Sequence, residues 1–154
     1  MVSAVKWEAA STARVAIDLG TTLANDTMSA VGAEIDNSTN LDTYFYAELT
    51  TSDQSALFDT TPPNDTAPTC DLYMTQAPDG TNYEDAPLTG GADQMNLFVG
   101  AFPIQKNTTS FLTVIGPFLL PPHKLKFYLD NQNGAGTLTA EWEVNIYTNN
   151  FESQ

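Results

Sequence analysis

The sequence predicts an all-β protein: an antiparallel β-sandwich of about eight strands, either jelly-roll-like or immunoglobulin-like. Apolar and polar residues alternate with a period of two in at least six segments, which is typical of strands with one buried and one wet face. The composition agrees, because the 21 Thr favour strands and the 12 Asn favour turns. No segment shows a convincing amphipathic helix. The 154 residues are expected to form a single sandwich domain, residues 1–154.

Eight segments are expected as strands. Alternation is clear in residues 41–49, where Leu41, Phe45 and Leu49 share the face predicted to be buried and Tyr44 lies on the other. In chain order, the segments are residues 15–19 (a short helix over residues 9–16 is the alternative), 31–35, 41–49, 70–76, 95–102, 111–115, 124–130 and 138–147. Polar turns or loops separate them, chiefly at residues 36–40, 51–69, 78–93 and 131–136.

The last segment has the firmest register. Trp142 falls between Ala140 and Val144 on the apolar side, so we expect its indole in the core. Residues 95–102 and 111–115 differ from the rest, because they are apolar on both faces. That pattern is typical of the centre of a sandwich or of a contact between subunits.

The charge balance excludes several partners. The chain has 5 Lys and Arg against 19 Asp and Glu, a formal net charge of −14. Clustered cations hold phosphate backbones, so the sequence predicts no nucleic-acid partner, and an anionic membrane surface is disfavoured for the same reason. We expect no signal peptide, because residues 1–10 lack a basic region followed by an apolar run, and no membrane span, because no apolar stretch approaches the ~20 residues that a span needs.

The sequence predicts no enzymatic activity. Its one Cys and one His can form neither an intramolecular disulfide nor a Cys/His zinc site. A catalytic triad would depend on His123 alone, which we expect to be an exposed residue where a strand begins. Cys70 lies on the apolar face of its segment and is expected to be a small core residue. No catalytic residues and no cofactor are predicted.

The most acidic loop is residues 79–85, where Asp79, Glu84 and Asp85 accompany Asn82. Such oxygen ligands could hold Ca²⁺, but the spacing is not that of an EF-hand. A solvated turn beginning at the Asp-Gly pair is favoured, and no metal site is predicted. The same interpretation applies to the acidic and amide residues at positions 36–42.

Tyrosines mark a candidate interface. Five of the six lie on the polar faces of their predicted strands, and Tyr83 lies in a loop. Ordinary cross-strand pairing, a protein interface and a glycan-stacking platform remain the alternatives. The candidate interface residues are Tyr44, Tyr46, Tyr83, Asp79, Glu84, Pro62 and Pro63.

Three stretches together resemble small virion proteins of tailed bacteriophages: IDNSTNLD at residues 35–42, DGTNYED at 79–85 and LPPHKLKFYLDNQNG at 120–134. The resemblance extends over residues 4–151, and its last stretch is the most specific. It implies a structural β-sandwich of the particle, and some similar small sandwiches decorate or cement capsids. The chain departs from that family in a longer, proline-bearing segment at residues 51–69 and in more acidic residues, which leaves its location on the particle open.

The expected function is therefore that of a capsid decoration or cement protein that binds the outer shell and stabilises it. The resemblance implies the major capsid protein or other virion proteins as partners, with a homo-oligomer as a further possibility. The expected location is the outer surface of the capsid, after assembly in the host cytoplasm. The alternative is a head-fibre, neck or tail component, including an adhesin module that binds host glycans.

Overall fold

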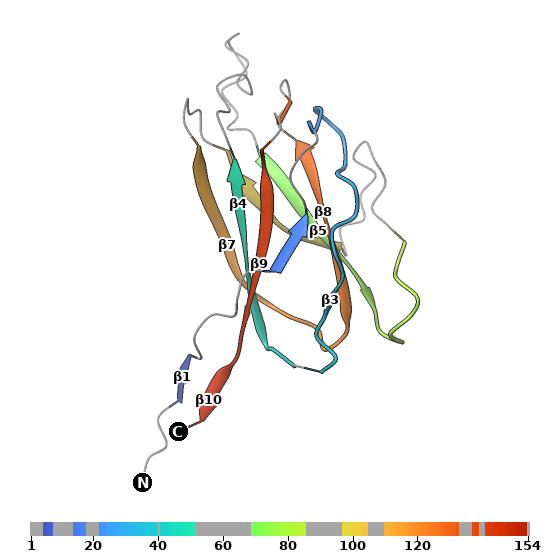
Figure 1. Ribbon diagram of the computed structural model, residues 1–154, viewed down its shortest axis with the longest axis vertical. Helices are drawn as coiled ribbons and strands as arrows, with labels where there is room; N and C mark the ends of the chain where they lie inside the picture. The colour runs from blue at the N-terminus through green and yellow to red at the C-terminus, as the bar shows by residue number, and fades with distance from the viewer. Residues whose placement is uncertain are drawn as a thin grey trace.

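The computed structural model describes residues 5–7, 14–17, 22–39, 41–51, 69–85, 97–104, 110–132, 137–138 and 141–153. Within these ranges the chain forms ten β-strands (Figure 1). In order they are β1 (Val5–Trp7), β2 (Arg14–Ile17), β3 (Ile35–Asp36), β4 (Tyr44–Thr51), β5 (Thr69–Ala77), β6 (Phe98–Pro103), β7 (Phe111–Leu119), β8 (Lys124–Gln132), β9 (Glu143–Asn149) and β10 (Phe151–Ser153).

The strands pair in a nested order. β5 pairs with β6, β4 with β7, β3 with β8, β2 with β9 and β1 with β10, always antiparallel. Additional pairing of β4 with β9 and of β5 with β8 rolls this ribbon into two sheets, β2-β9-β4-β7 and β3-β8-β5-β6. In an immunoglobulin sandwich the first strand pairs with the second, whereas here β2 pairs with β9. The predicted all-β sandwich is confirmed, and its strand order is that of a jelly roll.

The strands of the sandwich are unequal in length. Seven of those described contain four or more residues, and β3 adds only two. The pair β1 and β10 continues the ribbon as a separate two-stranded sheet, which projects from the body towards the lower left of Figure 1.

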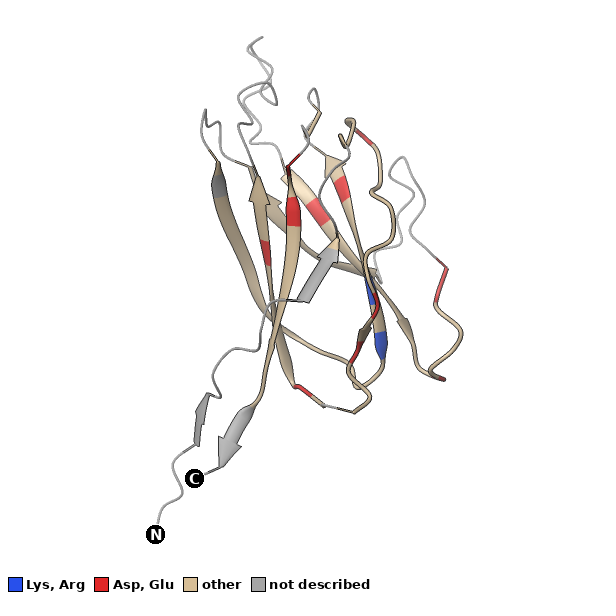
Figure 2. Ribbon diagram, viewed as in Figure 1, with Lys and Arg blue, Asp and Glu red and all other residues tan. Residues whose placement is uncertain are grey.

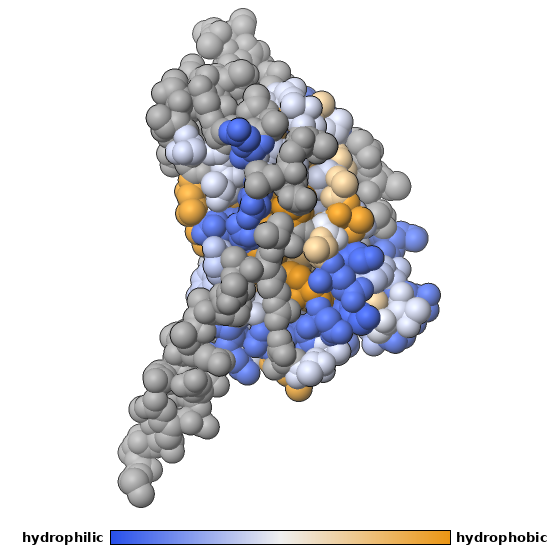
Figure 3. All heavy atoms as spheres, in the orientation of Figure 1, coloured by the Kyte–Doolittle hydropathy of each residue, from blue (hydrophilic) through white to orange (hydrophobic). Residues whose placement is uncertain are grey.

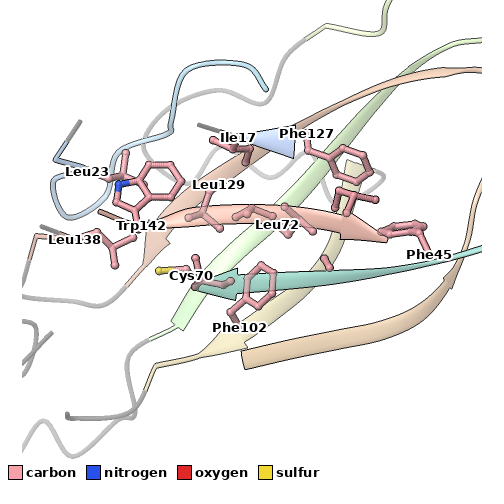
Figure 4. Close-up of a cluster of buried hydrophobic side chains, with 14 of the residues drawn as sticks. Ile17, Leu23, Phe45, Cys70, Leu72, Phe102, Phe127, Leu129, Leu138 and Trp142 are labelled. Carbon is pink, nitrogen blue, oxygen red and sulfur yellow. The ribbon is translucent and has the colours of Figure 1, made fainter. Parts of the chain in front are cut away.

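The core lies between the two sheets and follows the predicted alternation. Phe45, Ala47 and Leu49 of β4 are fully buried, and so are the apolar residues of β8 that face them. The ring centroids of Phe45 and Phe127 lie 5.5 Å apart across the sheets, in an edge-to-face arrangement. Figure 4 shows side chains of both sheets meeting in this layer. The period-two pattern therefore identified the buried faces of these central strands correctly.

Trp142 lies in the core, as predicted, although β9 begins one residue later. The indole is 1% exposed and lies close to Leu23 and Leu138, as the close-up in Figure 4 shows. Those two leucines form an isolated antiparallel bridge, with backbone hydrogen bonds of 3.0 and 2.9 Å. Glu141, which precedes Trp142, has a φ of +80° and is exposed. The tryptophan thus closes one end of the core.

The predicted strand over residues 31–35 is wrong before Ile35, where β3 begins, and so is the inward face predicted for Leu41. Val31 is 49% exposed and Leu41 is 55% exposed. Successive hydrogen bonds from the residue 31 segment to β8 leave from Ser29 and Gly32, three residues apart, so the period of two does not hold and Gly32 is buried in place of Val31. Leu41 lies in the turn before β4 with a φ of +53°, outside the strand ladder.

The predicted polar connection after β3 is held together by a buried amide. The Asn37 side chain is 1% exposed. Its Nδ2 donates to the carbonyl oxygens of Asp42 at 2.9 Å and Pro121 at 3.0 Å, and its Oδ1 accepts from the Asp42 N–H at 2.9 Å. These bonds tie the β3–β4 turn to the β7–β8 connection. Each of these two connections joins one sheet to the other.

The segments that are apolar on both faces become β6 and β7, and each lies at the edge of its sheet. Their placement at the centre of a sandwich is therefore wrong, and a contact between subunits stays a prediction.

β7 also carries a bulge, where Gly116 and Pro117 lie opposite the single residue Tyr46. Gly116 has a φ of +121°, and a Cβ there would approach the Phe45 carbonyl oxygen to 3.0 Å, so only glycine fits without strain.

Most of the two predicted long loops and the 131–136 turn lie outside the described residues, as do Pro62 and Pro63. Of the 78–93 loop, residues 78–85 are described.

Replacing Trp142 with Ala is expected to reduce the free energy of unfolding by about 3–5 kcal/mol, because it empties a large aromatic site in a closed core. Denaturant titration followed by circular dichroism measures the change. The matched control is Val31→Ala, a substitution at a half-exposed side chain, which is expected to cost less than about 0.5 kcal/mol. Equal effects of the two substitutions would contradict the assignment of Trp142 to the core.

Candidate interaction surface

The outer surface of the sheet β2-β9-β4-β7 gathers aromatic and apolar side chains that the strands turn away from the core. Because successive side chains alternate along a strand, the residues between Phe45, Ala47 and Leu49 face outward. The antiparallel register brings outward residues of β7 and β9 beside them. We call this surface the outer β4–β7–β9 face; it comprises Tyr44, Tyr46, Glu48, Thr50, Leu112, Val114, Leu119, Glu143, Tyr147 and Asn149.

The β7 side of this face is apolar. Leu112, Val114 and Leu119 expose 56, 51 and 71% of their surface, and they are three of the six exposed large hydrophobic side chains within the described residues. In the register, Leu119 lies opposite Tyr44 and Val114 opposite Glu48. Figure 3 shows hydrophobic atoms along the left edge of the body, where Figure 1 places β7. Isolated exposed leucines are common, but several on one strand are typical of an interaction site.

The charges on this face are acidic. The sequences of β4, β7 and β9 contain no Lys or Arg, whereas Glu48 and Glu143 lie on the face. The Tyr147 hydroxyl donates to Glu48 Oε1 at 3.2 Å, which holds the carboxylate among the outward side chains. Partial burial and the charge of Glu48 raise the pKa of Tyr147. Among residues whose side chains are described, Lys occurs only on β8, in the other sheet (Figure 2).

The acidic loop after β5 uses its first carboxylate for its own turn. Asp79 Oδ1 accepts from the backbone N–H groups of Thr81 at 2.9 Å and Asn82 at 2.7 Å, and Oδ2 accepts from Asn82 Nδ2 at 2.6 Å. These hydrogen bonds, above all that from the Asn82 N–H, lower the pKa of Asp79. Gly80 has the positive φ, +76°, that the turn requires. Glu84 and Asp85 are exposed.

Tyr83 fastens this loop to the outside of the second sheet. Its hydroxyl donates to Glu34 Oε2 at 2.5 Å, and Lys126 Nζ lies 4.2 Å from the centre of its ring. Glu34 Oε1 also pairs with Lys124 Nζ at 3.1 Å. The Tyr83 hydrogen bond, followed by that of Lys124, lowers the pKa of Glu34, and burial together with the same hydrogen bond raises the pKa of Tyr83.

The candidate interface residues that the structure describes therefore fall into two separate groups. Tyr44 and Tyr46 lie on the outer β4–β7–β9 face. Asp79, Tyr83 and Glu84 belong to the loop held against β8, on the outside of the opposite sheet. Since the core separates the two outer surfaces, one flat partner cannot cover both groups at once.

Sequence reasoning missed Leu112, Val114 and Leu119 as individual candidates. The signal was present, because residues 111–115 were apolar on both faces and a subunit contact was one explanation. What the sequence lacked was the position of that strand in the sheet. A strand of this composition is unremarkable at a sheet centre and exposes apolar surface at an edge.

Two carboxylates face one another across β5 and β8. Asp71 and Asp130 are directly paired in the register, and Asp130 is 1% exposed. Asp130 Oδ2 accepts from Gln132 Nε2 at 2.7 Å, whereas its buried Oδ1 has no hydrogen-bond partner among the described residues. Burial raises the pKa of both groups; the charge of Asp130 adds to the effect at Asp71, and that of Asp26 at Asp130.

The single cysteine lies in the core, and the single histidine lies in the connection between β7 and β8. Cys70 is fully buried, its Sγ lies 3.9 Å from Asn131 Oδ1, and burial raises the pKa of the thiol. Its predicted place in the core is confirmed. His123 lies just before β8, as predicted, but it is half-buried and not exposed; its carbonyl oxygen accepts from the Asn37 N–H at 3.1 Å.

Within the described ranges, no three side chains of His, Cys, Asp or Glu converge in a way that could hold a metal ion. The same part of the chain contains no helix with the length and hydropathy needed to cross a membrane. Comparison with models of protein families and with curated proteins found no match for this chain.

The Asp71–Asp130 pair predicts a pH dependence of stability. Because folding raises both pKa values, the folded state binds protons more tightly than the unfolded state, so the pair destabilises the protein at neutral pH and ceases to do so as pH falls towards about 4. Asp71→Asn is expected to raise the melting temperature at pH 7, and this gain should shrink towards pH 4. Thermal unfolding of both proteins across this range measures it.

The control for that experiment is Asp85→Asn, which removes an exposed carboxylate outside the pair. It lowers the net negative charge equally, so it separates the local effect from general charge repulsion. A gain for Asp71→Asn that is independent of pH, or equal to that of the control, would contradict the raised pKa of Asp71, which burial and the charge of Asp130 cause.

Proposed function

We propose that this chain is a structural protein of a tailed-bacteriophage particle and acts as a decoration or cement protein on the outside of the capsid. The observation that carries the proposal is the row of exposed Leu112, Val114 and Leu119 on an edge strand. Exposed apolar side chains gathered on one edge strand favour a protein that binds other proteins. The phage setting comes from the three sequence stretches that resemble small virion proteins.

The architecture suits such a role. A jelly roll packs two sheets face to face, so each sheet turns one of its surfaces away from the core. A decoration protein that binds neighbouring shell subunits adds contacts that must be lost before the shell opens. It therefore stabilises the closed shell by mass action, as any ligand stabilises the state to which it binds.

The charge of the chain favours the outside of a shell. With a formal net charge of −14, the protein is repelled by packaged DNA. On the outer surface that repulsion is absent, and the same charge keeps unbound copies soluble and apart. Cationic patches on a shell would attract it from solution.

Deletion of the gene for this chain tests the proposal. Particles lacking the protein are expected to assemble, to rupture at a lower temperature or under milder osmotic shock than the parent particles, and to regain resistance when the purified full-length chain is added. Release of DNA, followed with a fluorescent dye during heating, measures rupture, and mass spectrometry of parent particles establishes whether the chain is present.

Other outcomes would overturn the proposal. Unchanged particle stability with reduced adsorption to host cells would favour a fibre or adhesin module. Unchanged stability and adsorption would favour a neck, tail or non-virion role, and absence of the chain from purified parent particles would exclude any role in the virion.

A further inference from the structure

β7 is an edge strand in which the usual protection, here a bulge and a proline, is confined to one end. Within the described residues it pairs only with β4, and its sequence, FLTVIGPFL, contains no charged residue. Edge strands of proteins that stay monomeric commonly carry charges, prolines or bulges that discourage further contacts. Here the bulge at Gly116 and Pro117 interrupts one end, whereas Leu112 and Val114 lie on the uninterrupted stretch before it and are more than half exposed.

The outer β4–β7–β9 face becomes more polar with distance from this edge. Across the register, Val114 is followed by Glu48 of β4 and then by Asn145 of β9, while Leu112 is followed by Thr50 and Glu143. An apolar row is thus bordered by carboxylates on one side. Interfaces typically have an apolar centre and a polar rim, and the carboxylates provide such a rim on one side of the row.

The charges decide which partner fits. Neither β4, β7 nor β9 contains a Lys or Arg that could neutralise Glu48 and Glu143 across an interface. A second copy would bring the same carboxylates and another net charge of −14 to the contact. A surface with Lys or Arg beside apolar side chains would match both the apolar row and the carboxylates. Like charges brought together at an interface are costly, whereas opposite charges attract and speed association.

We propose that the outer β4–β7–β9 face is a docking surface for a protein whose contact region combines apolar side chains with Lys or Arg. The apolar side chains cover Leu112 and Val114, and the cations lie against Glu48. The inference deepens the proposed function and rests on it for the identity of the partner, which on a phage particle is the shell protein. The loop that contains Tyr83 and Glu84, on the opposite sheet, remains outside this contact.

Matched pairs of substitutions in the full-length chain test the surface. Val114→Lys places a cation in the apolar row, and Val31→Lys makes the same change at a valine of similar exposure, 49% against 51%, on the segment that lies along β8. Glu48→Lys reverses a charge on the face, and Glu84→Lys does so on the opposite loop. Thermal unfolding of each variant verifies that it folds.

The first measurement is binding of these proteins to particles that lack the chain. Val114→Lys and Glu48→Lys are expected to bind about tenfold more weakly than the wild type, the usual loss at an interface centre, whereas Val31→Lys and Glu84→Lys bind like the wild type. Binding of the wild type should also weaken as salt is raised. If the wild type and all four variants bind alike, the docking surface is refuted and the proposed function stands.

The second measurement does not depend on phage particles. A short peptide of alternating Lys and Val is titrated into the isotopically labelled chain, and amide chemical shifts are recorded by NMR; a peptide of alternating Glu and Val is the control. Shifts confined to β4, β7 and β9 with the Lys peptide alone support the inference, even if particles fail to bind and the proposed function falls. Shifts elsewhere, or equal shifts with both peptides, overturn it.

The third measurement is sedimentation of the isolated chain, which gives its oligomeric state. A monomer is expected. A dimer that Val114→Lys dissociates and Val31→Lys does not would assign the face to a second copy and overturn the proposed basic partner.

Discussion

Backbone hydrogen bonding between strands that are distant in the sequence is the constraint on which the rest of this protein depends. β4 pairs with β9 along seven residues, and β5 with β8 along nine. These two ladders convert a nested ribbon into two sheets, and only then do Phe45 and Phe127 meet in a common core. Every outward surface follows from the same registers, because a shift by one residue would exchange the inner and outer faces of a strand.

The same pairing explains why the two outer surfaces differ. In the sheet that contains β8, the outward Lys124 pairs with Glu34 and Lys126 lies over the Tyr83 ring, so both cations are engaged within the chain. In the sheet that contains β4, β7 and β9, carboxylates lie beside apolar side chains and these strands provide no cation. The cations of the first surface are therefore engaged within the chain, whereas the second surface presents carboxylates beside exposed apolar side chains.

Two buried polar side chains, Asn37 and Asp130, differ in how completely they are hydrogen-bonded. Asn37 satisfies its amide through three hydrogen bonds to the backbone and links two connections at one end of the sandwich. Asp130 is equally inaccessible, yet one of its oxygens has no hydrogen-bond partner within the described residues and a second carboxylate lies opposite it. The first arrangement stabilises a specific turn, whereas the second makes stability depend on protonation.

The sequence by itself determined the fold class, the buried faces of β4 and β8, and the burial of Cys70 and Trp142, because period-two alternation is a local property that survives any strand order. The tertiary structure decided the jelly-roll pairing, the edge position of β6 and β7, the exposure of Val31 and Leu41, and the union of Tyr83 with Glu34 across 49 residues of chain. Each of these depends on which segment lies alongside. For that reason the tyrosines of the candidate interface could be found from sequence, whereas the apolar edge beside two of them could not.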